Sequence, residues 1–222
     1  MRTSEPVGRR GRAMADKRRR IMNAARSLFA ERGIDGVTTQ QIADEADVAI
    51  GTLFRYAASK AELLLLVENE KFADAVDRGR QAAAAAISQA SPCVEAVMAM
   101  LGPVVHCVRE HPANGRVYLH ELIFGDPAEV NRAEGLAEAW RLESSIARIV
   151  HEAGRTETDN AAAVARVVTA VIHVTMTATL HLDASEPEVR DIIRTQLDAI
   201  LPSDHTRSPS PTERMDSPCV PS

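Results

Sequence analysis

The sequence has little of what a catalytic or metal centre needs. Its three cysteines, Cys93, Cys107 and Cys219, include no Cys-x-x-Cys pair, so neither a disulfide framework nor a zinc site is predicted. Seven histidines are present, but no nucleophile elbow, phosphate-binding glycine loop or metal-ligand spacing accompanies them. We therefore expect a protein that is not an enzyme and that needs no cofactor and no metal.

Aromatic residues make up only 3% of the chain, and Asn-Gly or Asp-Gly hairpin signals are few. A hydrophobic content of 45%, supplied mainly by good helix formers, excludes global disorder and predicts an all-α fold. No apolar run of about 18 residues lacks polar groups, and no apolar segment follows the first arginines. The sequence thus predicts a cytoplasmic protein with no membrane partner.

The formal net charge is −5, but the charge is unevenly distributed. Residues 1–60 hold 12 basic and 7 acidic side chains, whereas residues 61–222 hold 14 basic and 24 acidic ones. A basic N-terminal part can approach phosphate while an acidic remainder is held away from it. This pattern is compatible with nucleic-acid binding by the first quarter of the chain.

Residues 38–60 have the pattern of a helix-turn-helix. Thr38 and Gln41 form a capping box that begins one helix, in which Ile42 and Ala43 face inward. Asp47 stands at the turn, and a second helix is expected from about Ala49. Side chains suited to base edges and phosphates lie on or beside its outward face. The candidate DNA-binding residues are Thr38, Gln40, Ile50, Gly51, Thr52, Arg55, Tyr56 and Lys60.

Three motifs in this region carry a resemblance to a known family. They are Ala-Arg-Ser-Leu-Phe-Ala-Glu-Arg-Gly at 25–33, Thr-Thr-Gln-Gln-Ile-Ala at 38–43, and Gly-Thr-Leu-Phe-Arg-Tyr at 51–56 followed by Ser59-Lys60. Over residues 18–66 they resemble the N-terminal domain of the tetracycline-repressor (TetR) family. The resemblance implies a three-helix DNA-binding head, joined to a helical body that encloses a small-molecule pocket and forms a homodimer.

Three departures from the family pattern fall in the same region. Asp47 occupies the turn position that is usually glycine, and it tolerates a left-handed backbone better than most residues do. Ala49-Ile50 replaces the usual Ser-Lys, which removes a hydroxyl cap and one phosphate contact. Ala57-Ala58 replaces an aromatic-proline pair. Within the head, Phe54 is expected to join the small core beneath the two helices.

The remaining helical patterns define the other domains. We predict a flexible basic arm over 1–15, a DNA-binding head over 16–58, a helical effector-binding and dimerisation body over 59–201, and a disordered Pro/Ser-rich tail over 202–222. Ser59 should cap a helix that links head to body, and Pro127 should begin a long later helix. The candidate effector-binding residues are Met98, Met100, His106, Tyr118, Phe124 and Trp140.

Two helical segments near the end of the body are candidates for the dimer interface. Residues 160–182 are apolar nearly all round, and an amphipathic segment follows Pro187. The interface residues expected there are Val171, Thr175, Ala178, Leu182, Ile193 and Leu197. The predicted function is a homodimeric repressor that binds a palindromic double-stranded DNA operator and is released by a small-molecule effector. The alternative is a dimeric helical sensor that has lost specific DNA binding.

Overall fold

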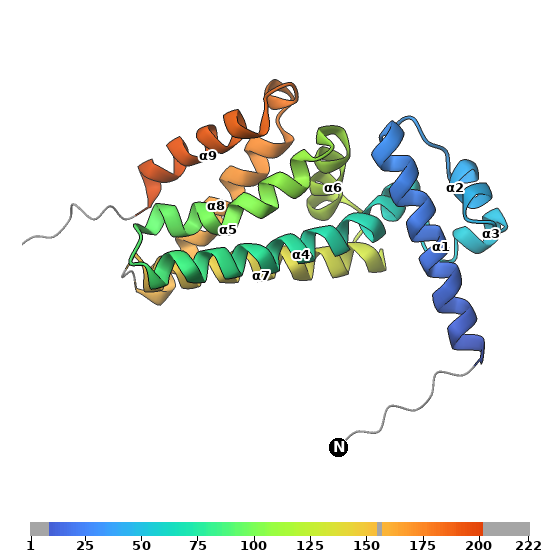
Figure 1. Cartoon of the computed structure of the whole chain (residues 1–222), viewed down its shortest axis with the longest axis horizontal. Coiled ribbons are helices and arrows are strands. Elements are labelled where there is room, and N and C mark those ends of the chain that lie inside the picture. The colour runs from blue at the N-terminus through green and yellow to red at the C-terminus, as the bar shows by residue number, and fades with distance from the viewer. Residues whose placement is uncertain (1–8, 155–156, 202–222) are drawn as a thin grey trace, which may run out of the picture.

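The computed structural model describes residues 9–154 and 157–201. Within these ranges the chain is helical and contains no β-strand, as the composition predicts. A small head of three helices lies at one end of a longer helical body (Figure 1). Residues 1–8 of the expected arm and residues 202–222 of the expected tail lie outside the described part.

The head comprises α1 (Arg9–Arg32), α2 (Thr39–Glu45) and α3 (Ile50–Leu53). The stripe of apolar residues on α1, which includes Ile21, Ala25 and Phe29, is buried as its helical spacing predicts. The predicted arm over 1–15 needs a correction, because α1 already begins at Arg9. Residues 9–15 are therefore part of a helix that projects beyond the rest of the head (Figure 1).

The body begins with α4 (Lys60–Ser88), which starts at the head and runs the length of the body. It packs along α5 (Cys93–Arg109) and α7 (Val130–Glu152), while α6 (Pro112–Phe124) closes the end nearest the head. Helix α7 begins at Val130 and not at Pro127 as predicted, since residues 126–129 form a turn.

The described part of the body continues with α8 (Thr158–Thr177), a 3₁₀ turn at Thr179–His181 and α9 (Glu186–Ile200). Helix α8 packs against α6, α7 and α9. By length and composition α8 is the one described helix that could cross a membrane, but a core helix of a soluble protein passes the same test. The single helix predicted over 160–182 thus ends at Thr177.

Candidate DNA-binding surface and effector cavity

The α2–α3 unit has the local geometry that the sequence predicts. The Thr38 hydroxyl accepts from the Gln41 amide at 3.2 Å, and the Gln41 side chain accepts from the Thr38 amide at 2.9 Å. Asp47 adopts a left-handed backbone with φ of 50°. The Arg20 guanidinium donates to its carbonyl at 3.1 Å and to its carboxylate at 3.0 Å. The turn that lacks the usual glycine is thereby fixed to α1.

Helix α3 presents the surface expected of a reading helix, although it is only one turn long. Gly51 and Arg55 are exposed and Thr52 is half-buried, whereas Ile50 packs partly against the head core. A Cβ added at Gly51 meets no atom within 4 Å, so the backbone there is open to close approach. The N-cap residue of α3 is Ala49, whose methyl side chain cannot accept a hydrogen bond, so no side chain caps this helix.

Other candidate DNA-binding residues have contacts within the head. The Tyr56 hydroxyl donates to the Met14 carbonyl at 3.1 Å, and the Lys60 ammonium donates to the Val37 carbonyl at 3.1 Å. Gln40 donates to Asp44 at 2.7 Å. Tyr56 is thus tied to α1 and Lys60 to the loop before α2, whereas the Gln40 bond lies within α2. Arg55, by contrast, has no ion-pair partner among the described residues.

Phe54 does not join the head core as predicted, because its side chain is 46% exposed. It is the C-cap residue that follows the single turn of α3. The core positions are taken by Leu53 and Ala57, which are buried. An exposed aromatic ring beside Gly51 and Arg55 adds apolar surface to the face that would meet DNA.

A chain of buried polar side chains connects the head to the body. Ser59 caps α4 as predicted, accepting from the Glu62 amide at 3.0 Å. The Glu62 carboxylate accepts from the Ala58 amide at 2.5 Å and from the Asn131 side chain at 3.0 Å. Asn131 also donates to the Tyr56 carbonyl at 3.3 Å, so α7 is bonded directly to the segment that follows α3.

This series of hydrogen bonds continues into the body. The Asn69 side chain donates to the Asn131 carbonyl at 2.7 Å and accepts from the Tyr118 hydroxyl at 3.1 Å. Tyr118 lies on α6 next to Phe72, with ring centroids 5.6 Å apart. Phe72 lines the cavity described below, so the hydrogen bonds run from Tyr118, which packs against the cavity wall, to Tyr56 in the segment after α3.

A second joint connects α6 to the end of α1. The Asn114 side chain accepts from the Ile34 amide at 2.8 Å and donates to the Phe29 carbonyl at 2.9 Å. Arg26 on α1 also pairs with Glu70 on α4 at 2.8 Å. The head is therefore held to the body by contacts from α4, α6 and α7.

The body contains an apolar cavity of about 450 Å³ between α5, α6, α7 and α8. Its wall is mostly aliphatic, with polar groups only from Glu143, Arg166, Thr169 and His173. Burial and the charge of nearby His120 lower the pKa of His173, which favours its neutral form at pH 7. A cavity of this size and character suits an apolar small molecule with a polar end. The apolar wall comprises Phe72, Val104, Val108, Leu119, Leu122, Ile123, Leu136, Ala139, Trp140, Leu142, Ala170, Ile172, Val174 and Met176.

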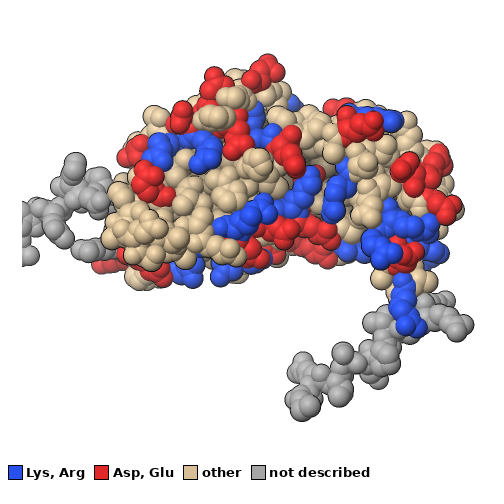
Figure 2. Space-filling view, viewed as in Figure 1, with Lys and Arg blue, Asp and Glu red and all other residues tan. Residues whose placement is uncertain are grey.

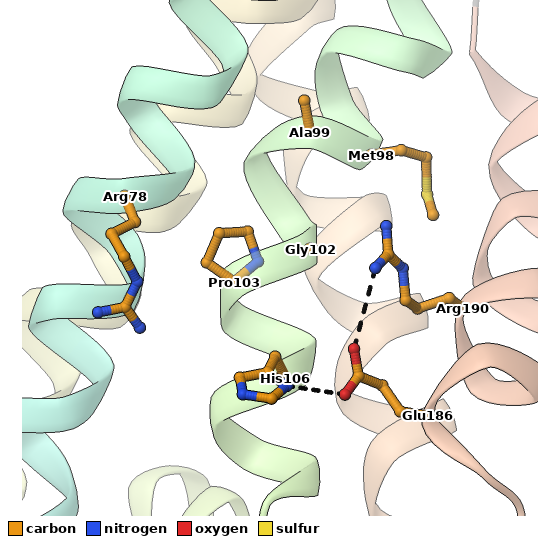
Figure 3. A pocket seen from close by; sticks show the side chains of 8 residues that line it. All are labelled: Arg78, Met98, Ala99, Gly102, Pro103, His106, Glu186 and Arg190. Carbon is orange, nitrogen blue, oxygen red and sulfur yellow. Dashed lines mark hydrogen bonds and ion pairs between the residues drawn. The ribbon is translucent and has the colours of Figure 1, made fainter.

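The predicted effector residues are not gathered at one place. Trp140 lines the apolar cavity, while Met100 and Tyr118 are buried in the core and Phe124 is 68% exposed on the surface. Met98 and His106 line a separate polar hollow on the other face of α5 (Figure 3). Helical spacing marks apolar faces, but which face lines a cavity depends on how the helices cross.

The polar hollow beside α5 is lined by polar and charged side chains that contact one another. Glu186 lies 2.8 Å from His106 Nδ1 and 3.9 Å from Arg190 Nη1, so its carboxylate contacts both side chains (Figure 3). Arg78 approaches from α4 on the opposite side of Pro103 (Figure 3). The apolar cavity is therefore the better candidate for an effector.

The candidate interface residues divide between the surface and the interior. Thr175, Ile193 and Leu197 are buried within the chain, where α8 packs on α9. Val171, Ala178 and Leu182 are half-buried. Helix α8 also has an exposed apolar face, whose residues recur every three or four positions and therefore lie on one side of the helix. This face, called here the α8 stripe, comprises Ala163, Val167, Ala170 and Val174.

Head and body together define a class of protein, namely a helix-turn-helix domain joined to a helical domain with its own cavity. Residues 21–67 match the family described as "Bacterial regulatory proteins, tetR family". The chain belongs to this TetR family, as the sequence motifs indicate. The relatives that it matches are transcriptional repressors and not enzymes.

One relative is the HTH-type transcriptional repressor KstR of Mycobacterium tuberculosis. It is 29% identical over 183 residues, which cover 80% of this chain and 77% of the relative. Among solved structures, Thermus thermophilus FadR, in complex with lauroyl-CoA, matches with a TM-score of 0.64 and 23% identity over 87% of this chain and 98% of that one. Bacillus subtilis FadR, in complex with stearoyl-CoA, has a TM-score of 0.55 and 15% identity, with 82% and 97% coverage. The two structures show that the fold is shared.

Proposed function

We propose that this protein is a homodimeric transcriptional repressor that binds a palindromic operator and is released by an apolar small-molecule effector. The observation that carries the proposal is the series of contacts from the cavity-lining Phe72 through Tyr118, Asn69 and Asn131 to the Tyr56 carbonyl after α3, in which the first contact is ring packing and the others are hydrogen bonds. An effector releases DNA only if it binds better to a conformation whose heads no longer fit the operator. Buried contacts between the cavity wall and the head allow a change at the cavity to favour one head position over another.

The DNA-binding part is supported by Gly51 and Arg55, which are both exposed on or beside α3. DNA selection from random and genomic fragments, at stated salt, should enrich one palindrome with half-sites about 34–36 Å apart or a multiple of this distance. Arg55→Ala should bind that palindrome about 5- to 160-fold more weakly, because a direct Arg contact is worth about 1–3 kcal/mol. Arg148→Ala on exposed α7 surface is the matched control. Weak retention without sequence preference would favour the alternative of a sensor without specific DNA binding.

The homodimer is supported by the α8 stripe, in which Val167 is 48% and Val174 is 63% exposed. Two copies that pair through α8 and α9 would cover this surface in a four-helix bundle. We expect sedimentation to give a dimer for the wild type and a monomer for Val167→Glu, because Val167 belongs to the stripe but does not line the cavity. Val130→Glu changes another exposed valine, at 67%, and should leave the dimer intact.

The effector part is supported by the apolar cavity, and the FadR relatives in complex with acyl-CoA thioesters suggest the first probe. Lauroyl-CoA should weaken operator binding by the wild type. Ala139→Phe, which fills the cavity, should bind the operator normally but no longer respond. Ala137→Phe lies two residues away on the exposed face of α7 and should respond as the wild type does. If lauroyl-CoA has no effect on the wild type, an acyl thioester is not the effector, and other apolar compounds should be screened.

A further inference from the structure

We propose that the N-terminal part of α1, residues 9–20, is a second DNA-binding surface. It would bind the phosphate backbone of the duplex beside the groove that α3 enters. The inference rests on the proposed function, since it assumes that α3 meets duplex DNA. It adds a contact that lies outside the helix-turn-helix and that carries no base recognition.

This part of α1 has an unusual charge density. Residues 9–20 contain seven basic side chains and one acidic one, Asp16. Twelve helical residues span about 18 Å, so the segment carries about one positive charge every 2.6 Å. Duplex DNA carries one negative charge per about 1.7 Å of its axis. The segment is therefore dense enough in positive charge to attract the phosphate backbone, and the cations without a partner among the described residues are the ones that can contact it.

Three of these cations are available for an external partner. Arg12, Lys17 and Arg18 are exposed and have no ion pair or hydrogen bond among the described residues. By contrast, Arg19 pairs with Asp16, and Arg20 is held by the turn at Asp47. Arg19 and Arg20 are therefore used in contacts within the head, whereas the positive charges of the other three have no anionic partner among the described residues.

The segment projects from the head instead of lying on it. Figure 1 shows the first turns of α1 extending past α2 and α3, and Figure 2 shows Lys and Arg gathered on this projection. The hydrogen bond from the Tyr56 hydroxyl to the Met14 carbonyl ties the projection to the segment after α3. The position of the projection is thus fixed relative to the reading helix, and a duplex bound at α3 passes close to it.

The absence of an apolar face in residues 9–20 favours DNA over a lipid surface. A membrane-binding amphipathic helix needs a stripe of large apolar residues on one side. Here Met14, which is 51% exposed, is the only large apolar side chain. Arg12, Lys17 and Arg18 point in different directions around the helix at 100° per residue, as a cationic rod would. Phosphates on a duplex also relieve the repulsion among these like charges.

The test compares two double variants of the full chain. Arg12→Gln with Arg18→Gln removes two of the uncompensated cations and keeps good helix formers. Arg78→Gln with Arg148→Gln removes two exposed body cations and changes the net charge by the same amount. Affinity for the selected operator is measured from about 50 to 300 mM salt. Each phosphate contact contributes about 0.9 to the slope of log affinity against log salt.

We expect the Arg12/Arg18 variant to bind more weakly, with a slope about two units less steep, and to select the same palindrome as the wild type. The body variant should keep the wild-type slope. A wild-type slope for the Arg12/Arg18 variant, or equal losses in both variants, would overturn the inference. A wild type that binds duplexes without sequence preference refutes the proposed function alone, because the Arg12/Arg18 variant would still show a flatter slope. If the wild type binds no duplex, both proposals are wrong.

Discussion

The side-chain amide of Asn131 lies 3.0 Å from the carboxylate of Glu62, and each residue is only 5% exposed. Asn131 belongs to α7, whereas Glu62 lies in the first turn of α4. The pair therefore joins two body helices at the point where the head begins. A buried carboxylate needs such donors, because an ionised group without partners costs several kcal/mol in a protein interior.

Asn131→Ala should destabilise the protein by about 2–4 kcal/mol, because it removes donors from the buried Glu62 carboxylate and the Tyr56 carbonyl. Denaturant unfolding measures this cost. Asn160→Ala changes an exposed asparagine on α8 and should alter stability by less than about 0.5 kcal/mol. If the two variants were equally stable, the joint would contribute nothing measurable to the fold.

Tyr118 lies at the other end of this series of hydrogen bonds, where a less disruptive substitution is possible. Tyr118→Phe removes only the hydroxyl that donates to Asn69 and keeps the ring against Phe72. We expect operator affinity and effector affinity, measured separately, to stay within about threefold of wild type. Their coupling should fall by about 0.5–2 kcal/mol, the range seen for residues between linked sites. Titrating the operator complex with effector measures this coupling. An unchanged coupling would show that the Tyr118 hydroxyl does not help to connect the cavity to the head.

Two glycines inside helices test how closely the body helices pack. A Cβ on Gly79 of α4 would lie 2.2 Å from the Met100 carbonyl oxygen on α5, which is backbone and cannot move alone. Gly79→Ala should therefore cost about 1–3 kcal/mol. At Gly102 the nearest atom is the tip of Arg190 at 3.5 Å, so Gly102→Ala should be neutral or stabilising by up to about 1 kcal/mol. Thermal unfolding of both variants checks the pair, and equal melting temperatures would contradict the close α4–α5 contact.

The features that sequence analysis predicts well are those determined by neighbours along the chain. The capping box of Thr38 and Gln41 and the cap at Ser59 involve residues within four positions of one another, and the left-handed backbone of Asp47 follows from its place in the turn, although Arg20 also holds it. Their geometry follows from backbone hydrogen bonds that local side chains satisfy. The sequence is sufficient for these elements.

The features that sequence analysis predicts poorly depend on contacts between segments that are distant along the chain. Phe54 is exposed because Leu53 and Ala57 fill the space under α3, and Phe124 lies outside the cavity because α6 turns its other face inward. The Asn131–Glu62 pair joins residues 69 positions apart, and nothing local marks either as a partner. Helix periodicity gives the apolar face of each helix but not the crossings that place these residues.

Gly51 provides a test of DNA approach that is separate from stability. Because an added Cβ meets no atom within 4 Å, Gly51→Leu should fold at least as well as the wild type, helped by the better helix propensity of leucine. The same side chain would hold the α3 backbone away from a duplex, and operator affinity should fall at least about tenfold. Ala162→Leu on the exposed face of α8 is the control. Normal operator binding by Gly51→Leu would place the DNA contact elsewhere on the head.

Cys107 should be a slow thiol in spite of its position near Lys71. Burial, together with the neighbouring Glu68 carboxylate, raises the pKa of the Cys107 thiol from 9.0 to about 12. Only the thiolate reacts with alkylating reagents, and a rise of this size lowers its fraction at pH 8 by about a thousandfold. Peptide mapping after iodoacetamide treatment at pH 8 should show little modification of Cys107 in the folded chain and rapid modification in urea. Rapid modification of the folded protein would instead indicate that α4 and α5 separate often enough to expose the thiol.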